Sequence, residues 1–244
     1  MNQVAVVTGA GSGVGQAIAL KLAEQNWQVV LVGRRAASLL KTIELGRDKS
    51  KFHMIPCDVS DEQAVNAMAA EVLKRYGTVQ VLVNGAGTNV PQRALPVLSG
   101  DNHRHIINVN LNGAFYCAQA FLPSMRKQAS GTIVNIVSDA ALAAILRAGP
   151  SYVMSKFGMR GLTQAINGEE RDKGIRACAI LPGEIDTPMM ELRPAMPPPE
   201  ARKQMLQPED VAECVMLAIN LPPRAVIEEL VVRPTRDKFV PAVS

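Results

Sequence analysis

Two residues of this sequence are spaced to exchange a proton. Tyr152 and Lys156 are four residues apart in a segment with helical periodicity, and residues at this spacing lie on one face of a helix. A free tyrosine has a pKa of about 10, so nearly all of it is neutral at neutral pH. A nearby ammonium group, at an effective dielectric constant of about 20, stabilises a phenolate by on the order of 4 kcal/mol. The spacing therefore predicts that Lys156 lowers the pKa of Tyr152 and makes it a general acid and base.

A glycine-rich turn near the start of the sequence predicts a phosphate-binding site. Gly9, Gly13 and Gly15 follow an apolar run over residues 4–8 and precede a helical pattern that begins near Gln16. Glycine adopts backbone angles that other residues resist, and it lets the backbone approach a pyrophosphate. The N–H groups at the start of the helix then face the phosphates. The turn therefore predicts a bound dinucleotide.

The elements that must position these residues alternate along the chain. Apolar, β-branched runs are separated by segments of helical periodicity, such as 17–25, 61–75 and 211–219, which is typical of right-handed βαβ units. We predict one domain over residues 1–244 with an α/β fold. It is a Rossmann-type, doubly wound, seven-stranded parallel sheet with helices on both faces, and its ligand lies at the carboxyl ends of the strands. The expected strands are residues 4–8, 29–32, 52–57, 79–83, 132–137, 175–181 and 230–232.

One segment interrupts this alternation. Residues 187–207 contain five prolines and several methionines. Long proline-rich loops in compact domains often cover a ligand, so the segment is predicted to be a substrate lid. The alternative is a passive surface loop.

Six motifs, in order, resemble those of the short-chain dehydrogenase/reductase family over about residues 3–190. They are TGxxxGxG at residues 8–15, Asn84-Gly85-Ala86-Gly87, Asn110, Ser138, the YxxxK of Tyr152 and Lys156, and Pro182-Gly183-Glu184-Ile185-Asp186-Thr187. Two departures stand out. The family's usual Asn-Asn-Ala-Gly has Gly85 at its second position, and the interval from Ser138 to Tyr152 is one residue longer than is common.

The resemblance implies hydride transfer between NADP(H) and a carbonyl or alcohol, with Tyr152 as general acid and base. It implies that Ser138 holds the substrate oxygen, that Lys156 also bonds the nicotinamide ribose, and that Asn110 supports a water relay to Lys156. Taken singly, each residue also has an ordinary structural explanation. The cofactor-binding residues implied are Gly9, Ser12, Gly13, Val14, Gly15, Arg34, Asp58, Val59, Asn84, Ala86, Gly87, Tyr152, Lys156, Pro182, Gly183, Ile185 and Thr187.

The end of the second expected strand favours NADP(H) over NAD(H), although NAD(H) stays a second candidate. An NAD site normally has an acidic residue there for the ribose hydroxyls, and this sequence has Gly33 followed by Arg34 and Arg35. A guanidinium pairs well with a 2′-phosphate. The alternative is that both arginines are solvated in a loop. Asp58 is expected either to contact the adenine or to cap the helix that starts near Ser60.

Composition and motifs argue against several other classes. Hydrophobic residues make up 48% of the chain and charged residues 20%, as expected for a globular protein, and the longest apolar runs are far shorter than the ~18 residues of a membrane span. The net charge of +4 is spread over the chain, so no nucleic-acid partner is expected.

The four cysteines form no CxxC pair, and His103 and His105 point in different directions on a helix, so no metal is expected. Ser138 lacks the GxSxG setting of a hydrolase. The N-terminal residues show no leader pattern, which predicts a cytoplasmic protein.

The leading functional prediction is a carbonyl reductase or alcohol dehydrogenase acting on a small molecule. Enoyl reductases of the family separate their tyrosine and lysine more widely. The alternative is a catalytically weak, NADP-binding regulatory or scaffold protein of the same fold. Substrate choice depends on residues 88–101, 139–151 and 188–207, where Arg147 is either a contact for an anionic substrate or, like Glu184, a solvated charge. By resemblance, a homodimer or homotetramer is expected through the helices that contain Asn110 and Tyr152.

Overall fold

Seven parallel strands form one sheet in the computed structural model, which describes residues 3–235. The strand order is β3-β2-β1-β4-β5-β6-β7, and in the middle of the sheet Val6 pairs with Val30 on one side and Leu82 on the other. The predicted doubly wound sheet is thus confirmed. The strands are β1 (Val4–Thr8), β2 (Gln28–Gly33), β3 (Phe52–Pro56), β4 (Val81–Asn84), β5 (Gly131–Ile136), β6 (Ile175–Pro182) and β7 (Glu229–Val232).

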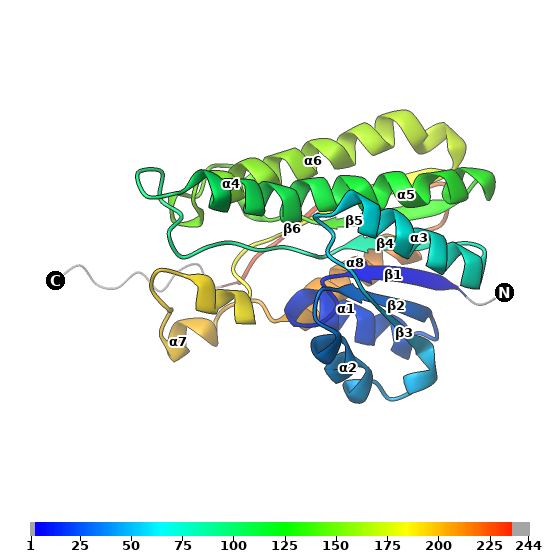
Figure 1. Cartoon of the computed structure of the whole chain (residues 1–244), viewed down its shortest axis with the longest axis horizontal. Coiled ribbons are helices and arrows are strands. Elements are labelled where there is room, and N and C mark those ends of the chain that lie inside the picture. Colours follow the sequence, from blue (N-terminus) through cyan, green and yellow to red (C-terminus); the bar gives the residue numbers. More distant parts are fainter. Residues whose placement is uncertain (1–2, 236–244) are drawn as a thin grey trace.

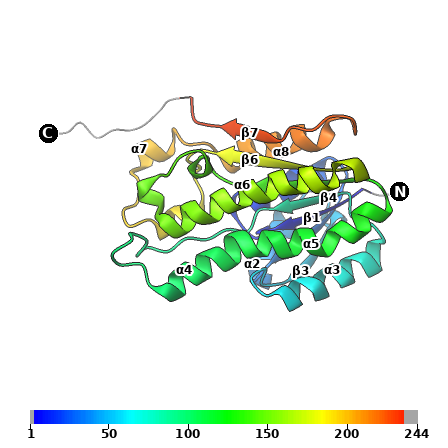
Figure 2. The same ribbon diagram turned by 90° about the horizontal axis from the view of Figure 1, so that it is seen from above.

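Helices cover both faces of the sheet (Figures 1 and 2). On one face lie α1 (Gly13–Glu24), α2 (Ala36–Leu45) and α8 (Pro208–Asn220), and on the other lie α3 (Glu62–Tyr76), α4 (Gly100–Ile107), α5 (Gly113–Lys127) and α6 (Pro150–Glu170). None of the helices within residues 3–235 has the length and apolar character of a membrane span.

The central strands are buried on both faces, which explains their continuous apolar sequence. All five residues of β1 are buried. Ala5 and Val7 pack with α1 and α8, whereas Val4 and Val6 pack with α3 and α5. Alternate residues of one strand therefore contribute to two separate cores, and the sheet is a rigid support for the loops at its ends.

The carboxyl ends of all strands lie at the same edge of the sheet (Figure 1). From β1 the chain proceeds outward through β2 to β3, and from β4 it proceeds in the other direction to β7. The connections that leave β1 and β4 therefore diverge and open a crevice between them.

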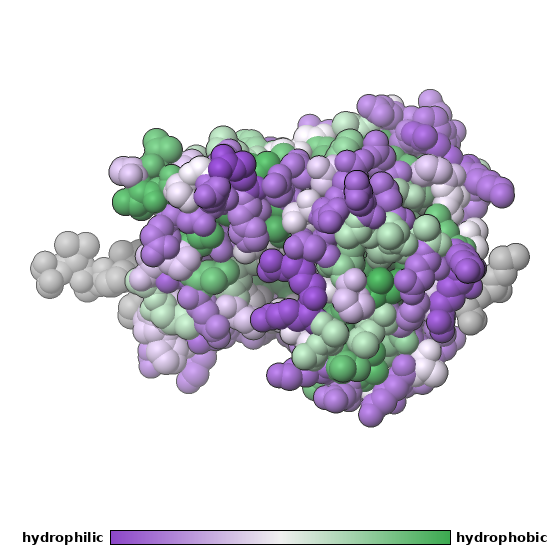
Figure 3. Space-filling view, in the orientation of Figure 1, coloured by the Kyte–Doolittle hydropathy of each residue, from purple (hydrophilic) through white to green (hydrophobic). Residues whose placement is uncertain are grey.

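The loop between β4 and α4 has an inner and an outer part. Its inner part carries Asn89 and Arg93, which are 6% and 8% exposed, whereas Leu95 and Val97 farther along are strongly exposed. Figure 3 shows the outer part as an apolar tip at the upper left of the molecule. The inner part is therefore available as a wall of the crevice.

Several element boundaries differ from the sequence prediction. The fourth strand begins at Val81 rather than at residue 79, and the first helix begins at Gly13, inside the glycine turn. Between α4 and α5 a single π-helical turn, Asn108–Asn112, was not expected. The proline-rich segment contains a 3-10 helix, Pro188–Leu192, and the short helix α7 (Pro199–Arg202).

Candidate active site

The glycine turn brings the start of α1 against the loop after β4. Gly9 has a φ of +70°, and a Cβ atom there would lie 2.7 Å from the carbonyl oxygen of Gly85. Ser12 precedes α1 but makes no side-chain hydrogen bond to it, so the first N–H groups of the helix stay available to an external acceptor. No acidic residue occupies the first turn. This end of α1 therefore suits an anion such as a pyrophosphate.

A cavity of about 270 Å³ runs along the carboxyl edge of the sheet from this turn to Tyr152. Nearly all residues expected to bind the cofactor line it, so the residues present fit an extended dinucleotide. They are Gly9, Ser12, Gly13, Val14, Gly15, Arg34, Asp58, Val59, Ala86, Gly87, Tyr152, Lys156, Pro182, Gly183, Ile185 and Thr187.

The far end of this cavity is basic. Arg34 and Arg35 line it together with Ser38, from the first turn of α2, which sequence reasoning missed. Burial raises the pKa of Asp58, but the hydrogen bonds from Ser60 and, to a smaller extent, the charge of Arg34 together hold that pKa below its ordinary value. Asp58 Oδ1 accepts hydrogen bonds from the backbone N and Oγ of Ser60, at 3.0 and 2.7 Å.

The suggestion that Asp58 caps the following helix is wrong. Asp61 caps α3 by accepting from the backbone N–H groups of Gln63 and Ala64. Asp58 instead lines the cavity.

Asn84 was expected to bind the cofactor, but it does not line the cavity. Its Nδ2 donates to Asn135 Oδ1 at 2.9 Å and to the carbonyl of Ala114 at 3.3 Å, between the sheet and the helices that cover it.

The close packing of the next residue explains why the chain has glycine where the family motif usually has asparagine. A Cβ atom at Gly85 would lie 2.8 Å from the carbonyl oxygen of Thr8. Thr8 Oγ1 accepts from the N–H groups of Gly85 and Ala86, at 3.1 Å each, and holds this turn.

Helix α6 positions Tyr152 and Lys156 on one face, as predicted. The helix begins with Pro150 after Gly149, whose φ of +79° reverses the chain. Lys156 is 4% exposed, and its Nζ donates to the carbonyl of Ile136 at 2.8 Å. Nζ lies 5.5 Å from the centre of the Tyr152 ring. The phenol and the amine therefore share one end of the cavity.

The pKa of Tyr152 shifts in the direction opposite to the prediction. Burial raises the pKa of its phenol above the ordinary value, and hydrogen bonding with Ser138 lowers it only in part. Burial also lowers the pKa of Lys156 to about 7. Burial is the largest cause of the shift for each of the two groups. The expectation that Lys156 acidifies Tyr152 is thus wrong for the protein's own groups, and Tyr152 is a neutral phenol at neutral pH.

Ser138 and Tyr152 line a second cavity, of about 140 Å³, as well as the first. Ser138 follows β5, and its Oγ accepts from the backbone N of Ala140 at 3.1 Å. A small molecule in the second cavity would therefore meet both hydroxyls where the cavities join. Its walls come from the three segments predicted to determine substrate choice, through residues such as Asn89, Ala148 and Met190.

Asn110 is fully buried at the π-helical turn and does not line either cavity. Its Oδ1 accepts from the backbone N of Thr88 at 2.7 Å, and its Nδ2 donates to the carbonyl of Thr88 and to Ser155 Oγ, at 3.0 and 3.1 Å. It therefore ties the loop after β4 to α6, beside Lys156. A π turn displaces backbone groups from regular helix bonding and is frequent at functional sites.

Only the first part of the predicted lid reaches the site. Thr187 and Met189 line both cavities, and Met190 and Arg193 line the second. Arg202 on α7 instead bonds Asp186. Sequence reasoning missed Arg93 and Arg193, since no motif marks either residue.

The family model described as short chain dehydrogenase matches residues 3–197. The chain is 36% identical over 243 residues to a sepiapterin reductase of Chlorobaculum tepidum, covering 96% of this chain and 97% of that one.

Two solved structures show the same fold with a nucleotide present. An alcohol dehydrogenase of the archaeon Thermococcus sibiricus, complexed with 5-hydroxy-NADP, is 31% identical with a TM-score of 0.85, over 98% of this chain and 100% of that one. A variant of actinorhodin polyketide ketoreductase with NADPH is 30% identical with a TM-score of 0.87, over 96% of each chain. This chain therefore belongs to the short-chain dehydrogenase/reductase family and is an NAD(P)-dependent oxidoreductase.

Proposed function

We propose that this protein reduces the carbonyl group of a small molecule to an alcohol with NADP(H), and that Tyr152 donates the proton. The observation that carries the proposal is that Ser138 and Tyr152 line both cavities. A molecule in the smaller cavity and a dinucleotide in the larger one would meet at these two hydroxyls. The protonation state supports reduction, because a phenol with a raised pKa keeps its proton at neutral pH.

The binding of the cofactor rests on two features of the larger cavity. The uncapped N-terminus of α1 suits the pyrophosphate, and Arg34 beside Gly33 suits the 2′-phosphate of NADP(H). The two similar structures described with NADP-type cofactors support the same choice. When bound, a nicotinamide cofactor supplies the hydride.

The proton follows a separate route through side chains of this protein. Ser138 Oγ orients the carbonyl oxygen by donating a hydrogen bond, and Tyr152 Oη transfers its proton to that oxygen as the alcohol forms. Lys156, fixed by the carbonyl of Ile136, then stabilises the phenolate that remains. Asn110 joins the loop after β4 to α6 by hydrogen bonds to Thr88 and Ser155, so that Lys156 stays beside the ring of Tyr152.

The test is consumption of NADPH, followed at its absorbance band, with a panel of small aldehydes, ketones and oxo acids. The proposal predicts substrate-dependent consumption with formation of the matching alcohol. Tight binding of NADPH with no consumption by any compound would favour the regulatory or scaffold alternative.

A further inference from the structure

The smaller cavity is lined by an unusual number of charged side chains. Arg93, Arg147 and Arg193 contribute three guanidinium groups, and Asp139 and Glu184 contribute two carboxylates. All five lie in the cavity that Ser138 and Tyr152 also line. The ion pairs that these side chains form with one another and with their neighbours determine which charge is available to bind a ligand.

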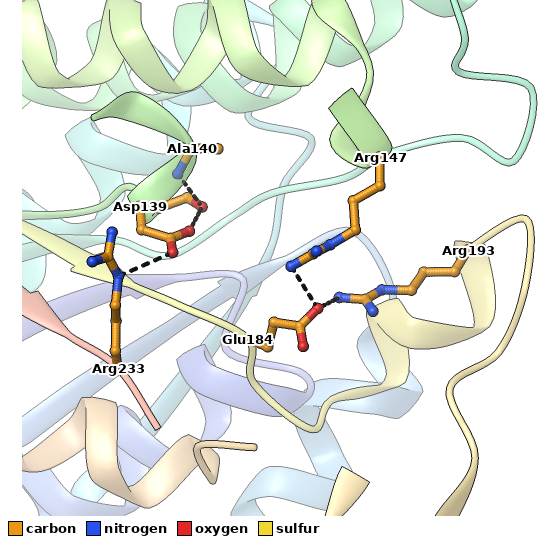
Figure 4. A network of polar contacts seen from close by, with 7 residues as sticks. Asp139, Ala140, Arg147, Glu184, Arg193 and Arg233 are labelled. Carbon is orange, nitrogen blue, oxygen red and sulfur yellow. Dashed lines mark hydrogen bonds and ion pairs between the residues drawn. The ribbon is translucent and has the colours of Figure 1, made fainter. Parts of the chain in front are cut away.

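Both carboxylates are already paired (Figure 4). Glu184 Oε1 lies 2.9 Å from Arg147 Nη2 and 3.1 Å from Arg193 Nη2, so one oxygen serves two guanidinium groups. Asp139 Oδ2 lies 3.3 Å from Nε of Arg233. No carboxylate is therefore left to neutralise a third arginine of the cavity.

Of the three arginines that line the cavity, Arg93 is the one with no ion pair to an acidic residue among residues 3–235. It is 8% exposed, and its guanidinium donates to main-chain carbonyls, at 2.7 Å to Val90 and also to Leu192. Burial lowers the pKa of Arg93, and the like charge of Arg193 lowers it further. A buried cation with a second cation nearby and no counter-ion is costly, and an anion placed between them would remove that cost.

We propose that Arg93 and Arg193 form a carboxylate-binding subsite, and that the substrate is a small oxo acid whose carbonyl reaches Ser138 and Tyr152. The inference rests on the proposed function and names its substrate class. The cavity of about 140 Å³ is below the roughly 300–1,000 Å³ of sites for drug-sized ligands, so the acid is small. Arg93 and Arg193 line the same cavity as Ser138 and Tyr152, so a carboxylate held by the arginines and a carbonyl at the two hydroxyls can belong to one small molecule.

The competing explanation is that Arg93 only ties the loop after β4 to the 3-10 helix Pro188–Leu192. A tie would affect every substrate equally, whereas a carboxylate subsite distinguishes an acid from its ester. The experiment therefore compares kcat/KM with NADPH for three acids and their methyl esters: pyruvate, acetoacetate and levulinate, in which the carbonyl lies progressively farther from the carboxylate.

We expect the wild-type protein to reduce at least one acid at least tenfold more efficiently than its ester. Arg93→Gln keeps hydrogen-bond donors for the main-chain carbonyls but removes the charge, and it should lower kcat/KM for the acid by about 10- to 100-fold and leave the ester unchanged. Arg193→Gln, at a more exposed position, should act in the same direction and keeps the test valid if Arg93→Gln does not fold. Arg224→Gln, at an exposed arginine outside the cavity, is the matched control.

Two results would overturn the subsite and leave the proposed function intact: esters reduced as well as acids by the wild type, or equal losses for acid and ester in both variants. Absence of NADPH consumption with all six compounds and with simple aldehydes would overturn the proposed function and this inference with it.

Discussion

At the scale of single residues, burial controls the chemistry of the site. Tyr152 keeps its proton because the phenol is withdrawn from water, and burial of Lys156 lowers the pKa of its ammonium to about 7. In the mechanism that we propose, Lys156 acts mainly after the proton has left Tyr152, because the phenolate then raises the affinity of the neighbouring amine for its own proton.

Arg34 gives a residue-scale prediction about the cofactor. Arg34→Ser should lower kcat/KM with NADPH by about 10- to 100-fold, because one charge-assisted contact to the 2′-phosphate is worth roughly 1.5–3 kcal/mol. Efficiency with NADH should stay within about twofold, since NADH has no phosphate there. Steady-state kinetics with both cofactors measures this, with Arg47→Ser as an exposed control. An equal loss with NADH would show that Arg34 acts on the loop rather than on the phosphate.

The residues with sequence motifs could be predicted, and those without could not. Periodicity and spacing were sufficient to place Tyr152 and Lys156 on one helix face. The direction of the Tyr152 pKa shift depends on how far the folded chain buries the phenol, which the spacing does not reveal. Arg93 and Arg193 are 100 residues apart and line the same cavity only because two loops lie at the same end of the sheet.

At the scale of elements, α6 is the scaffold that carries the reacting groups, and it is anchored at both ends. Gly149 and Pro150 begin it, and near its end Glu170 accepts two hydrogen bonds from Arg126 of α5, at 2.5 and 2.7 Å, and one from Lys173 at 3.1 Å. The pKa of the buried Glu170 carboxyl is lowered to about 2, mainly by the hydrogen bonds from Arg126.

Glu170→Gln should lower the free energy of unfolding by about 1–3 kcal/mol at neutral pH, because it leaves the Arg126 guanidinium without its anion. The folded pKa of about 2 lies below the ordinary 4.5, so this stabilisation is complete above about 4.5 and is lost as the pH falls toward 2. Urea unfolding at several pH values measures both effects, with the exposed Glu169→Gln as the control. A difference between wild type and variant that does not shrink on acidification would contradict the assignment.

At the scale of the whole molecule, the doubly wound, seven-stranded parallel sheet could be predicted from the alternation of apolar runs and helical segments. The π turn at Asn108–Asn112 did not, because it departs from the regular helix by one residue and no local sequence rule marks it. The boundaries of β4 shifted because main-chain pairing with β1 and β5, rather than the apolar run, decides where the strand begins.

Three large apolar side chains are exposed on the outer face of α5 and α6. Phe115 on α5 and Met154 and Phe157 on α6 are each more than 40% exposed, and the two helices lie side by side on the same face (Figure 2). We propose that this face joins copies of the chain into a dimer or tetramer, because solvent-exposed apolar clusters commonly mark interfaces.

Light scattering should therefore give a multiple of the 26.2 kDa chain mass, and Phe157→Glu should reduce that mass. Leu217→Glu, at an exposed leucine of α8 on the other face, should leave the mass unchanged. A monomeric wild-type protein at micromolar concentration would contradict the interface.

Proton donation by Tyr152 is the central step of the proposed reaction, and Tyr152→Phe tests it directly because the substitution removes one hydroxyl and keeps the ring. NADPH binding, measured by fluorescence titration, should be largely unchanged, and turnover with the best carbonyl substrate should fall by at least about 100-fold. Tyr116→Phe, on α5, should keep wild-type turnover. If Tyr152→Phe bound NADPH and turned over at close to the wild-type rate, another group would have to supply the proton.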